Sequence, residues 1–98
     1  MLTTLEAVVA RLVDGYSPER IILFGSRGHG YGRPDSDFDV LILKDTPLRP
    51  AERRAEVEWL LADRRIPLDL IVYTPDEFRR LYSEGSPFVL GAASRRTQ

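Results

Sequence analysis

The fold is decided by residues 22–43, which read Ile22-Leu-Phe-Gly-Ser-Arg-Gly-His-Gly-Tyr-Gly-Arg-Pro-Asp-Ser-Asp-Phe-Asp-Val-Leu-Ile-Leu43. One apolar run stops abruptly at Gly25-Ser26, and a second apolar run begins just after Asp37-Phe38-Asp39. The segment between them is rich in glycine and also carries two arginines and a proline. This pattern predicts two buried strands that frame a polar loop.

Two carboxylates stand at the start of the second strand. Asp37 and Asp39 are two residues apart, so they project to the same face of a strand. Like charges this close repel each other, and burial increases the cost. A divalent cation is the simplest compensation, and oxygen ligands in a chain without cysteine favour Mg²⁺ over Zn²⁺. The alternative is that both side chains form a solvated strand end.

The remaining elements follow from apolar periodicity and from helix-capping signals. The sequence predicts a helix over residues 4–14, introduced by the capping box Thr3-x-x-Glu6 and ended by Gly15. Further predicted elements are strands at 21–24, 37–43 and 67–73, a helix from Pro50 to residues 63–65, a helix capped by Thr74, and a short helical turn at 88–90.

Two helix faces are expected to pack inward. In the helix after Thr74, the predicted buried stripe is Phe78, Leu81 and Tyr82. The helix after Pro50 has a mixed pattern, and its inward side remains open. Its candidate apolar members are Ala51, Ala55 and Leu61, with either Val57 or Trp59.

The connections predict how the strands pair. A short link between the first two strands favours an antiparallel pair, and a helical crossover between the second and third favours a parallel pair. Asp69, the one acid of the third strand, would then meet Asp37 and Asp39 at one edge of a small sheet. The alternative is a structural role for Asp69, paired with an arginine. We therefore expect an α/β (α+β) fold, with helices packed on a small mixed sheet, as a single domain over residues 1–98.

Gly25-Ser26, a spacer, and then Asp37-Phe38-Asp39-Val40 together resemble the nucleotidyltransferase superfamily that includes DNA polymerase beta. The chain is most similar to the minimal nucleotidyltransferases, which have Gly-Ser-Arg and Ser-Asp-x-Asp loops. The resemblance implies the polymerase beta-like fold, ATP as substrate and two Mg²⁺ ions. It also implies site residues: catalytic and metal-binding Asp37, Asp39 and Asp69, and phosphate-binding Gly25, Ser26 and Arg27.

The resemblance leaves some roles open. Asp69 would either accept the proton of the acceptor hydroxyl or orient a metal ion. Arg27 would either contact phosphate or face solvent, and His29 is expected to be an exposed loop residue rather than a proton-transfer group. Minimal nucleotidyltransferases act as antitoxins that adenylylate a tyrosine of a helical HEPN toxin. The resemblance therefore implies a HEPN partner protein.

Composition excludes several other classes. The 98 residues have a formal net charge of −1, which favours neither nucleic acid nor an anionic membrane as a partner. No apolar run approaches the length of a membrane span, and we expect a cytoplasmic protein. A fragment of a polymerase or of a tRNA nucleotidyltransferase is disfavoured, because no basic aromatic platform is visible. A non-catalytic module that neutralises a partner by contact remains the main alternative.

Overall fold

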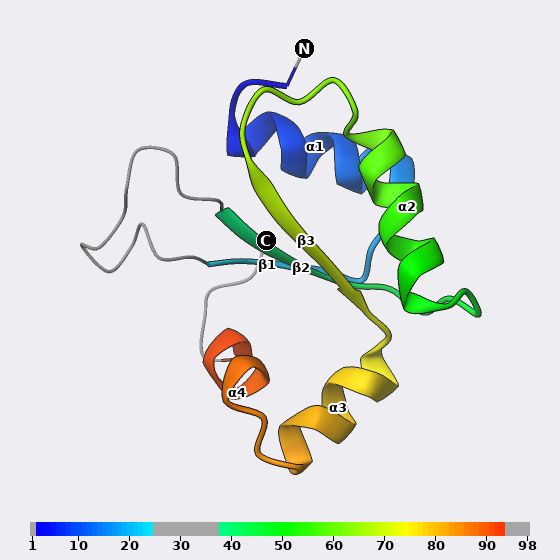
Figure 1. Cartoon of the computed structure of the whole chain (residues 1–98), viewed down its shortest axis with the longest axis vertical. Coiled ribbons are helices and arrows are strands. Elements are labelled where there is room, and N and C mark those ends of the chain that lie inside the picture. The colour runs from blue at the N-terminus through cyan, green and yellow to red at the C-terminus, as the bar shows by residue number, and fades with distance from the viewer. Residues whose placement is uncertain (1, 25–37, 94–98) are drawn as a thin grey trace.

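The computed structural model describes residues 2–24 and 38–93 of the chain (Figure 1). In chain order, the elements are α1 (Leu5–Tyr16), β1 (Arg20–Phe24), β2 (Phe38–Leu43), α2 (Pro50–Leu60), β3 (Leu68–Tyr73), α3 (Pro75–Ser83) and α4 (Pro87–Ala93). None of the helices within these ranges is long and apolar enough to cross a bilayer.

The three strands form one mixed sheet in the order β1-β2-β3. Strands β1 and β2 are antiparallel, with Ile22 opposite Leu41, and β2 and β3 are parallel, with Leu41 opposite Ile71. The predicted fold class and both predicted pairings are confirmed. Because α2 is the crossover between β2 and β3, the chain starts both of these strands at the same end of the sheet (Figure 1).

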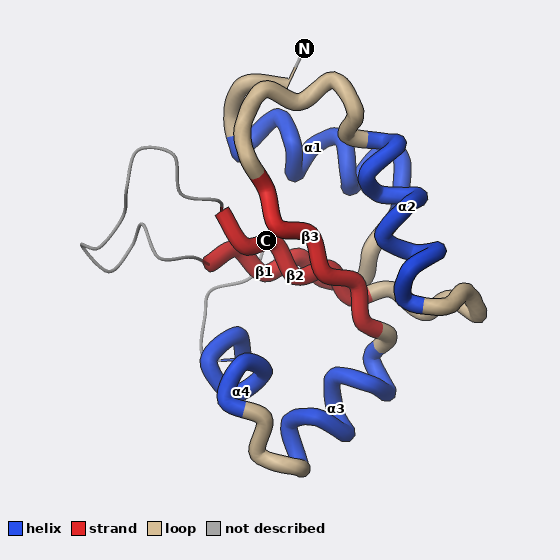
Figure 2. Tube along the Cα trace, viewed as in Figure 1, coloured by secondary structure: helices blue, strands red, loops and turns tan. Residues whose placement is uncertain are grey.

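Helices cover both faces of the sheet, with α1 and α2 on one side and α3 and α4 on the other (Figure 2). Side chains alternate between the faces, so each strand contributes to two cores. The core on the α1/α2 side includes Val8, Leu12, Val40, Ile42, Val57, Leu61, Leu68, Leu70 and Val72. The core on the α3/α4 side includes Ile22, Leu41, Leu43, Phe78 and Val89.

Both ends of α1 differ from the prediction. The N-cap is Thr4, whose hydroxyl accepts from the Ala7 amide at 3.1 Å, rather than Thr3. Gly15 lies inside the helix, and a side chain there would place its Cβ 2.8 Å from Leu60 Cδ1. The end of the Leu60 side chain of α2 therefore lies directly against Gly15 of α1. The helix ends at Ser17, which adopts the left-handed conformation at φ 51°.

The buried residues of α2 and α3 also differ in part from those predicted from the sequence. Leu61 is buried as expected, and Val57 is the buried member of the pair left open, but Ala51 and Ala55 are exposed. Trp59 is 82% exposed. In α3, Phe78 is buried and Leu81 packs against its core, whereas Tyr82 is exposed, contrary to the prediction.

The position in α2 that apolar periodicity missed is Arg53, which is only 5% exposed. Its guanidinium donates to Glu77 Oε1 at 2.7 Å and to Glu77 Oε2 at 3.2 Å, and its Nε donates to the Leu48 carbonyl at 2.7 Å. Glu77 also accepts from the Thr74 amide at 2.9 Å, which completes the N-terminal cap of α3. One bidentate ion pair thus joins α2 to α3 past the end of β3.

This ion pair predicts a pH dependence of stability. Hydrogen bonds from Arg53 hold the pKa of the Glu77 carboxyl below its usual value of about 4.3. When the pKa of a carboxyl is lower in the folded state than in the unfolded state, its ionised form stabilises the fold. This stabilisation is complete at pH values above the unfolded-state pKa and is lost as the pH falls through the folded-state pKa. We expect the difference in unfolding free energy between wild type and Glu77→Gln to be largest near neutral pH and to shrink below about pH 4. Urea titrations across that range measure it, and a difference that grew on acidification would contradict the assignment.

Candidate active site

Asp39 and Asp69 occupy equivalent positions on neighbouring strands. Each is the second residue of its strand, β2 or β3, and the two are paired residues in the parallel register. Paired residues on adjacent parallel strands project to the same face, about 4.8 Å apart along the hydrogen-bonding direction. The fold therefore places two carboxylate-bearing residues side by side, although 30 residues separate them in sequence.

The alternation of burial shows which face the two acids share. In β3, Leu68 and Leu70 are buried in the core under α1 and α2, and Asp69 lies between them on the opposite face. Asp39 follows the same alternation in β2, because Val40 is buried in the α1/α2 core. Both acids thus lie on the α3/α4 face, at the end where β2 and β3 begin.

The end of β1 reaches the same place. Phe24 is the last described residue before Gly25, and it is paired with Asp39 in the antiparallel register. The predicted phosphate-binding segment Gly25, Ser26 and Arg27 lies outside the described residues, as do Asp37 and His29. Their predicted roles remain predictions.

Asp69 has a basic neighbour, an arginine whose position in the chain the sequence did not indicate. The Arg54 guanidinium lies 4.0 Å from Asp69 Oδ1, and both side chains are about half exposed. Since β3 is an edge strand of the described sheet, α2 can present Arg54 to Asp69 from beside the sheet. At this distance and exposure, an ion pair contributes little to stability, typically between zero and about 1 kcal/mol. The contact agrees with the structural alternative for Asp69, but it leaves the carboxylate accessible.

The donor set fits a hard divalent cation. Asp39 and Asp69 offer only carboxylate oxygens, the ligands that Mg²⁺ prefers. Two carboxylates at adjacent register positions repel each other, and a cation bound between them would remove that cost. Within residues 2–24 and 38–93, no three side chains of His, Cys, Asp or Glu gather into a cluster. Asp37, the third predicted ligand, is outside those ranges.

Comparison with known proteins decides the family. A model of the nucleotidyltransferase domain matches residues 4–93. The chain belongs to the nucleotidyltransferase domain family. The observed mixed sheet with helices on both faces is the small nucleotidyltransferase fold. Searches of curated proteins and of solved structures gave no significant match.

Membership of the nucleotidyltransferase family indicates transfer of a nucleotidyl group from a nucleoside triphosphate, with a divalent metal ion as the usual cofactor. Asp39 and Asp69 lie side by side, as the strand pairing predicted from the sequence requires, and their role as metal ligands stays a prediction. Sequence reasoning did not find Arg54, because a contact between a helix and the strand that follows it leaves no local signal.

Proposed function

We propose that this nucleotidyltransferase transfers AMP from ATP, with Mg²⁺, to a hydroxyl group of another protein, and that the acceptor is a tyrosine of a HEPN toxin. The observation that carries the proposal is the register pairing of Asp39 with Asp69 in a chain of the nucleotidyltransferase family. The toxin and its tyrosine rest on the resemblance to minimal nucleotidyltransferases. Under this proposal, the protein is a cytoplasmic antitoxin.

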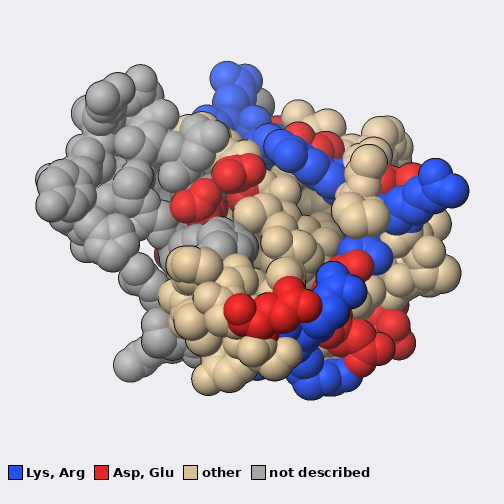
Figure 3. All heavy atoms as spheres, turned by 60° about the horizontal axis from the view of Figure 1, so that its bottom comes forward, with Lys and Arg blue, Asp and Glu red and all other residues tan. Residues whose placement is uncertain are grey.

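The surface favours a protein over a nucleic acid as acceptor. On the face shown in Figure 3, acidic and basic side chains of the described residues are interspersed rather than gathered into a basic patch. Nucleic-acid binding generally requires such a patch to neutralise phosphates. The formal net charge of −1 also disfavours a nucleic-acid acceptor.

In the proposed reaction, the acceptor hydroxyl oxygen bonds to the α-phosphorus of ATP, and the bond from that phosphorus to the pyrophosphate oxygen breaks. Bound Mg²⁺ would neutralise phosphate charge and lower the pKa of the hydroxyl. Asp37, Asp39 and Asp69 would hold two such ions, and Asp69 would accept the hydroxyl proton. The amides after Gly25, the Ser26 hydroxyl and Arg27 would bind the departing pyrophosphate. Catalysis of this kind depends on positioning and electrostatic stabilisation.

The proposal is tested with ATP radiolabelled at the α-phosphorus, incubated with the protein and its co-purified partner. We expect label on the partner with wild type and a loss of at least about a hundredfold with Asp39→Asn, which retains the size of the side chain but removes its charge. Tryptic mapping of the labelled partner identifies the acceptor residue. Equal labelling by wild type and Asp39→Asn would reject the carboxylate mechanism.

A non-catalytic binding module is the competing function. The specific observation in its favour is that Arg54 already lies beside Asp69, as in a structural ion pair. A stable complex with the partner, without label from either wild type or Asp39→Asn, would support this function and reject the transferase.

A further inference from the structure

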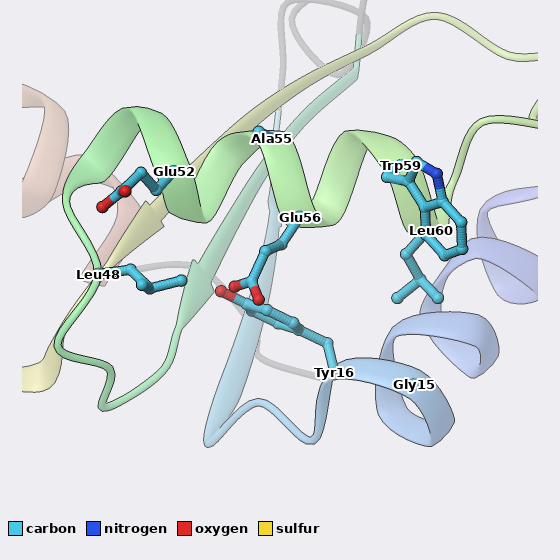
Figure 4. Close-up of a pocket in the computed structure, with 8 residues that line it drawn as sticks. All are labelled: Gly15, Tyr16, Leu48, Glu52, Ala55, Glu56, Trp59 and Leu60. Atoms are coloured by element: carbon cyan, nitrogen blue, oxygen red, sulfur yellow. The ribbon is translucent and has the colours of Figure 1, made fainter.

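A groove between the end of α1 and the side of α2 is separate from the carboxylate pair. This open groove has a volume of about 600 Å³ and is lined by Gly15, Tyr16, Leu48, Glu52, Ala55, Glu56, Trp59 and Leu60 (Figure 4). Five of these residues come from α2, at positions 52, 55, 56, 59 and 60, and this helical spacing places them on one stripe of that helix. The volume lies within the range of ordinary ligand sites, about 300–1,000 Å³.

The groove combines apolar surface with negative charge. The residues that line it include two carboxylates and no basic side chain. Glu52 accepts from the Arg49 amide at 3.0 Å, and no ion pair involving Glu56 is found within the described residues. At the C-terminal end of α1 the Tyr16 carbonyl accepts from the Lys44 ammonium, so the negative charge of the groove comes from the carboxylates of Glu52 and Glu56.

Tyr16 forms a fixed wall of the groove. Its ring packs under the Lys44 ammonium, 4.2 Å from the ring centroid, and Lys44 also donates to the Tyr16 carbonyl. Tyr16 is only 6% exposed, yet its hydroxyl has no hydrogen-bond partner within the described residues. Figure 4 shows this hydroxyl and the Glu56 carboxylate facing each other.

The Tyr16 hydroxyl is a neutral donor. Burial raises the pKa of the Tyr16 hydroxyl above its usual value, and the Glu56 carboxylate shifts it in the same direction. A buried donor without an acceptor is a cost that proteins rarely carry without a reason. A cation docked on Glu56 would hold the carboxylate over Tyr16 and allow the hydroxyl to donate to it.

Trp59 forms the other end of the groove and is 82% exposed. An exposed indole is a strong anchor for a partner, because tryptophan and arginine dominate binding energy at interfaces. It also offers a ring face for a cation, next to the carboxylate of Glu56 one helical turn away. From residue 52 to residue 59, the stripe extends about 10 Å along α2, at 1.5 Å per residue. This span suits side chains from two turns of a helix better than one compact cation.

We propose that this groove docks a helical segment of a partner protein that carries arginine or lysine one turn from leucine. The basic side chain binds between Glu56 and the Trp59 ring, and the leucine packs against Leu48 and Leu60. Nucleic acids and anionic membranes are disfavoured because the groove would repel their phosphates. This inference goes beyond the proposed nucleotidyl transfer and is tested without nucleotide, so that its failure would leave the proposed function standing.

The test uses the fluorescence of Trp59, the one tryptophan of the chain. The probe is an alanine-based helical peptide with paired leucine and arginine residues, and the matched peptide carries glutamate in place of arginine. We expect a saturable blue shift with the arginine peptide alone. Glu56→Gln should weaken its binding about tenfold. Glu84→Gln, which removes an exposed acid of the α3–α4 connection, should not change it.

Tyr16→Phe separates binding from folding. This change removes a buried donor without a partner, so the melting temperature should not fall, whereas peptide affinity should drop severalfold. The proposal is overturned if the glutamate peptide binds equally well, if Glu56→Gln binds like wild type, or if the arginine peptide gives no saturable shift. A shift that depends on protein concentration without peptide would assign the groove to a second copy of the chain and also overturn it.

Discussion

Replacing Asp69 by asparagine is expected to lower nucleotidyl transfer at least about a hundredfold while the fold stays intact. The reason is geometric, because Asp69 is the register partner of Asp39, and removing its charge would leave a bound cation with one fewer anionic ligand from the sheet. The stability cost should be small, since the Asp69 side chain is about half exposed and its ion pair with Arg54 spans 4.0 Å. The measurement is the initial rate of label transfer from ATP, with circular dichroism to verify folding.

Arg54→Gln is the informative control for Asp69→Asn. If Asp69 acts only as the partner of Arg54, then removing either side of the ion pair should have the same small effect. If Asp69 is a metal ligand, Asp69→Asn should abolish transfer while Arg54→Gln retains most of it. Asp45→Asn, in an exposed loop, gives the baseline for loss of one surface carboxylate. Equal rates for Asp69→Asn and Asp45→Asn would refute the catalytic role of Asp69.

The largest effect on stability is expected from Glu77→Ala. This change leaves the guanidinium of Arg53 buried at 5% exposure without its bidentate partner, and it also removes the cap of the Thr74 amide. Removing one partner of a fully buried pair costs about 3–5 kcal/mol. Because the Glu77 side chain remains 27% exposed, we expect about 2–3 kcal/mol, which lowers the melting temperature by about 8 °C or more.

A double-mutant cycle isolates the contribution of the ion pair. Arg53→Met combined with Glu77→Ala should cost less than the sum of the single changes, because the double variant holds no unpaired buried charge. Asp76→Ala is the matched control, an exposed acid in the same turn of α3, and should cost less than about 1 kcal/mol. Strict additivity of Arg53→Met and Glu77→Ala in urea unfolding would show that the two side chains do not stabilise each other.

Much of the fold was predictable because connection type constrains strand pairing. The link through α2 required a parallel pair, and that pair places Asp69 beside Asp39. Long-range contacts were not predictable. Burial of Arg53 depends on Glu77, which is 24 residues away, and the apolar positions of α2 gave no sign of it. Periodicity likewise favoured Tyr82 as a core residue, although α3 presents that position to solvent.

The end of α1 was missed for a local reason. Glycine is the usual residue in the left-handed position after a helix, so Gly15 was the expected stop. In the structure Gly15 lies inside the helix with the Leu60 side chain next to it, and Ser17 takes the left-handed conformation instead. For the candidate site, the sequence predicted the adjacency of Asp39 and Asp69. The contributions of Asp37 and of the Gly25-Ser26-Arg27 segment stay predictions, because those residues lie outside the described ranges.

The central claim is that Asp39 and Asp69 bind one divalent cation in the presence of nucleotide. Paramagnetic broadening of backbone amide signals by Mn²⁺ tests it most directly, with an ATP analogue that cannot be cleaved between the α- and β-phosphates. We predict that the amides of Asp39, Asp69 and their strand neighbours broaden first, and that Asp69→Asn requires much more Mn²⁺ for the same effect. Broadening centred on Glu52 and Glu56 of α2, with the amides of Asp39 and Asp69 unaffected, would contradict the claim.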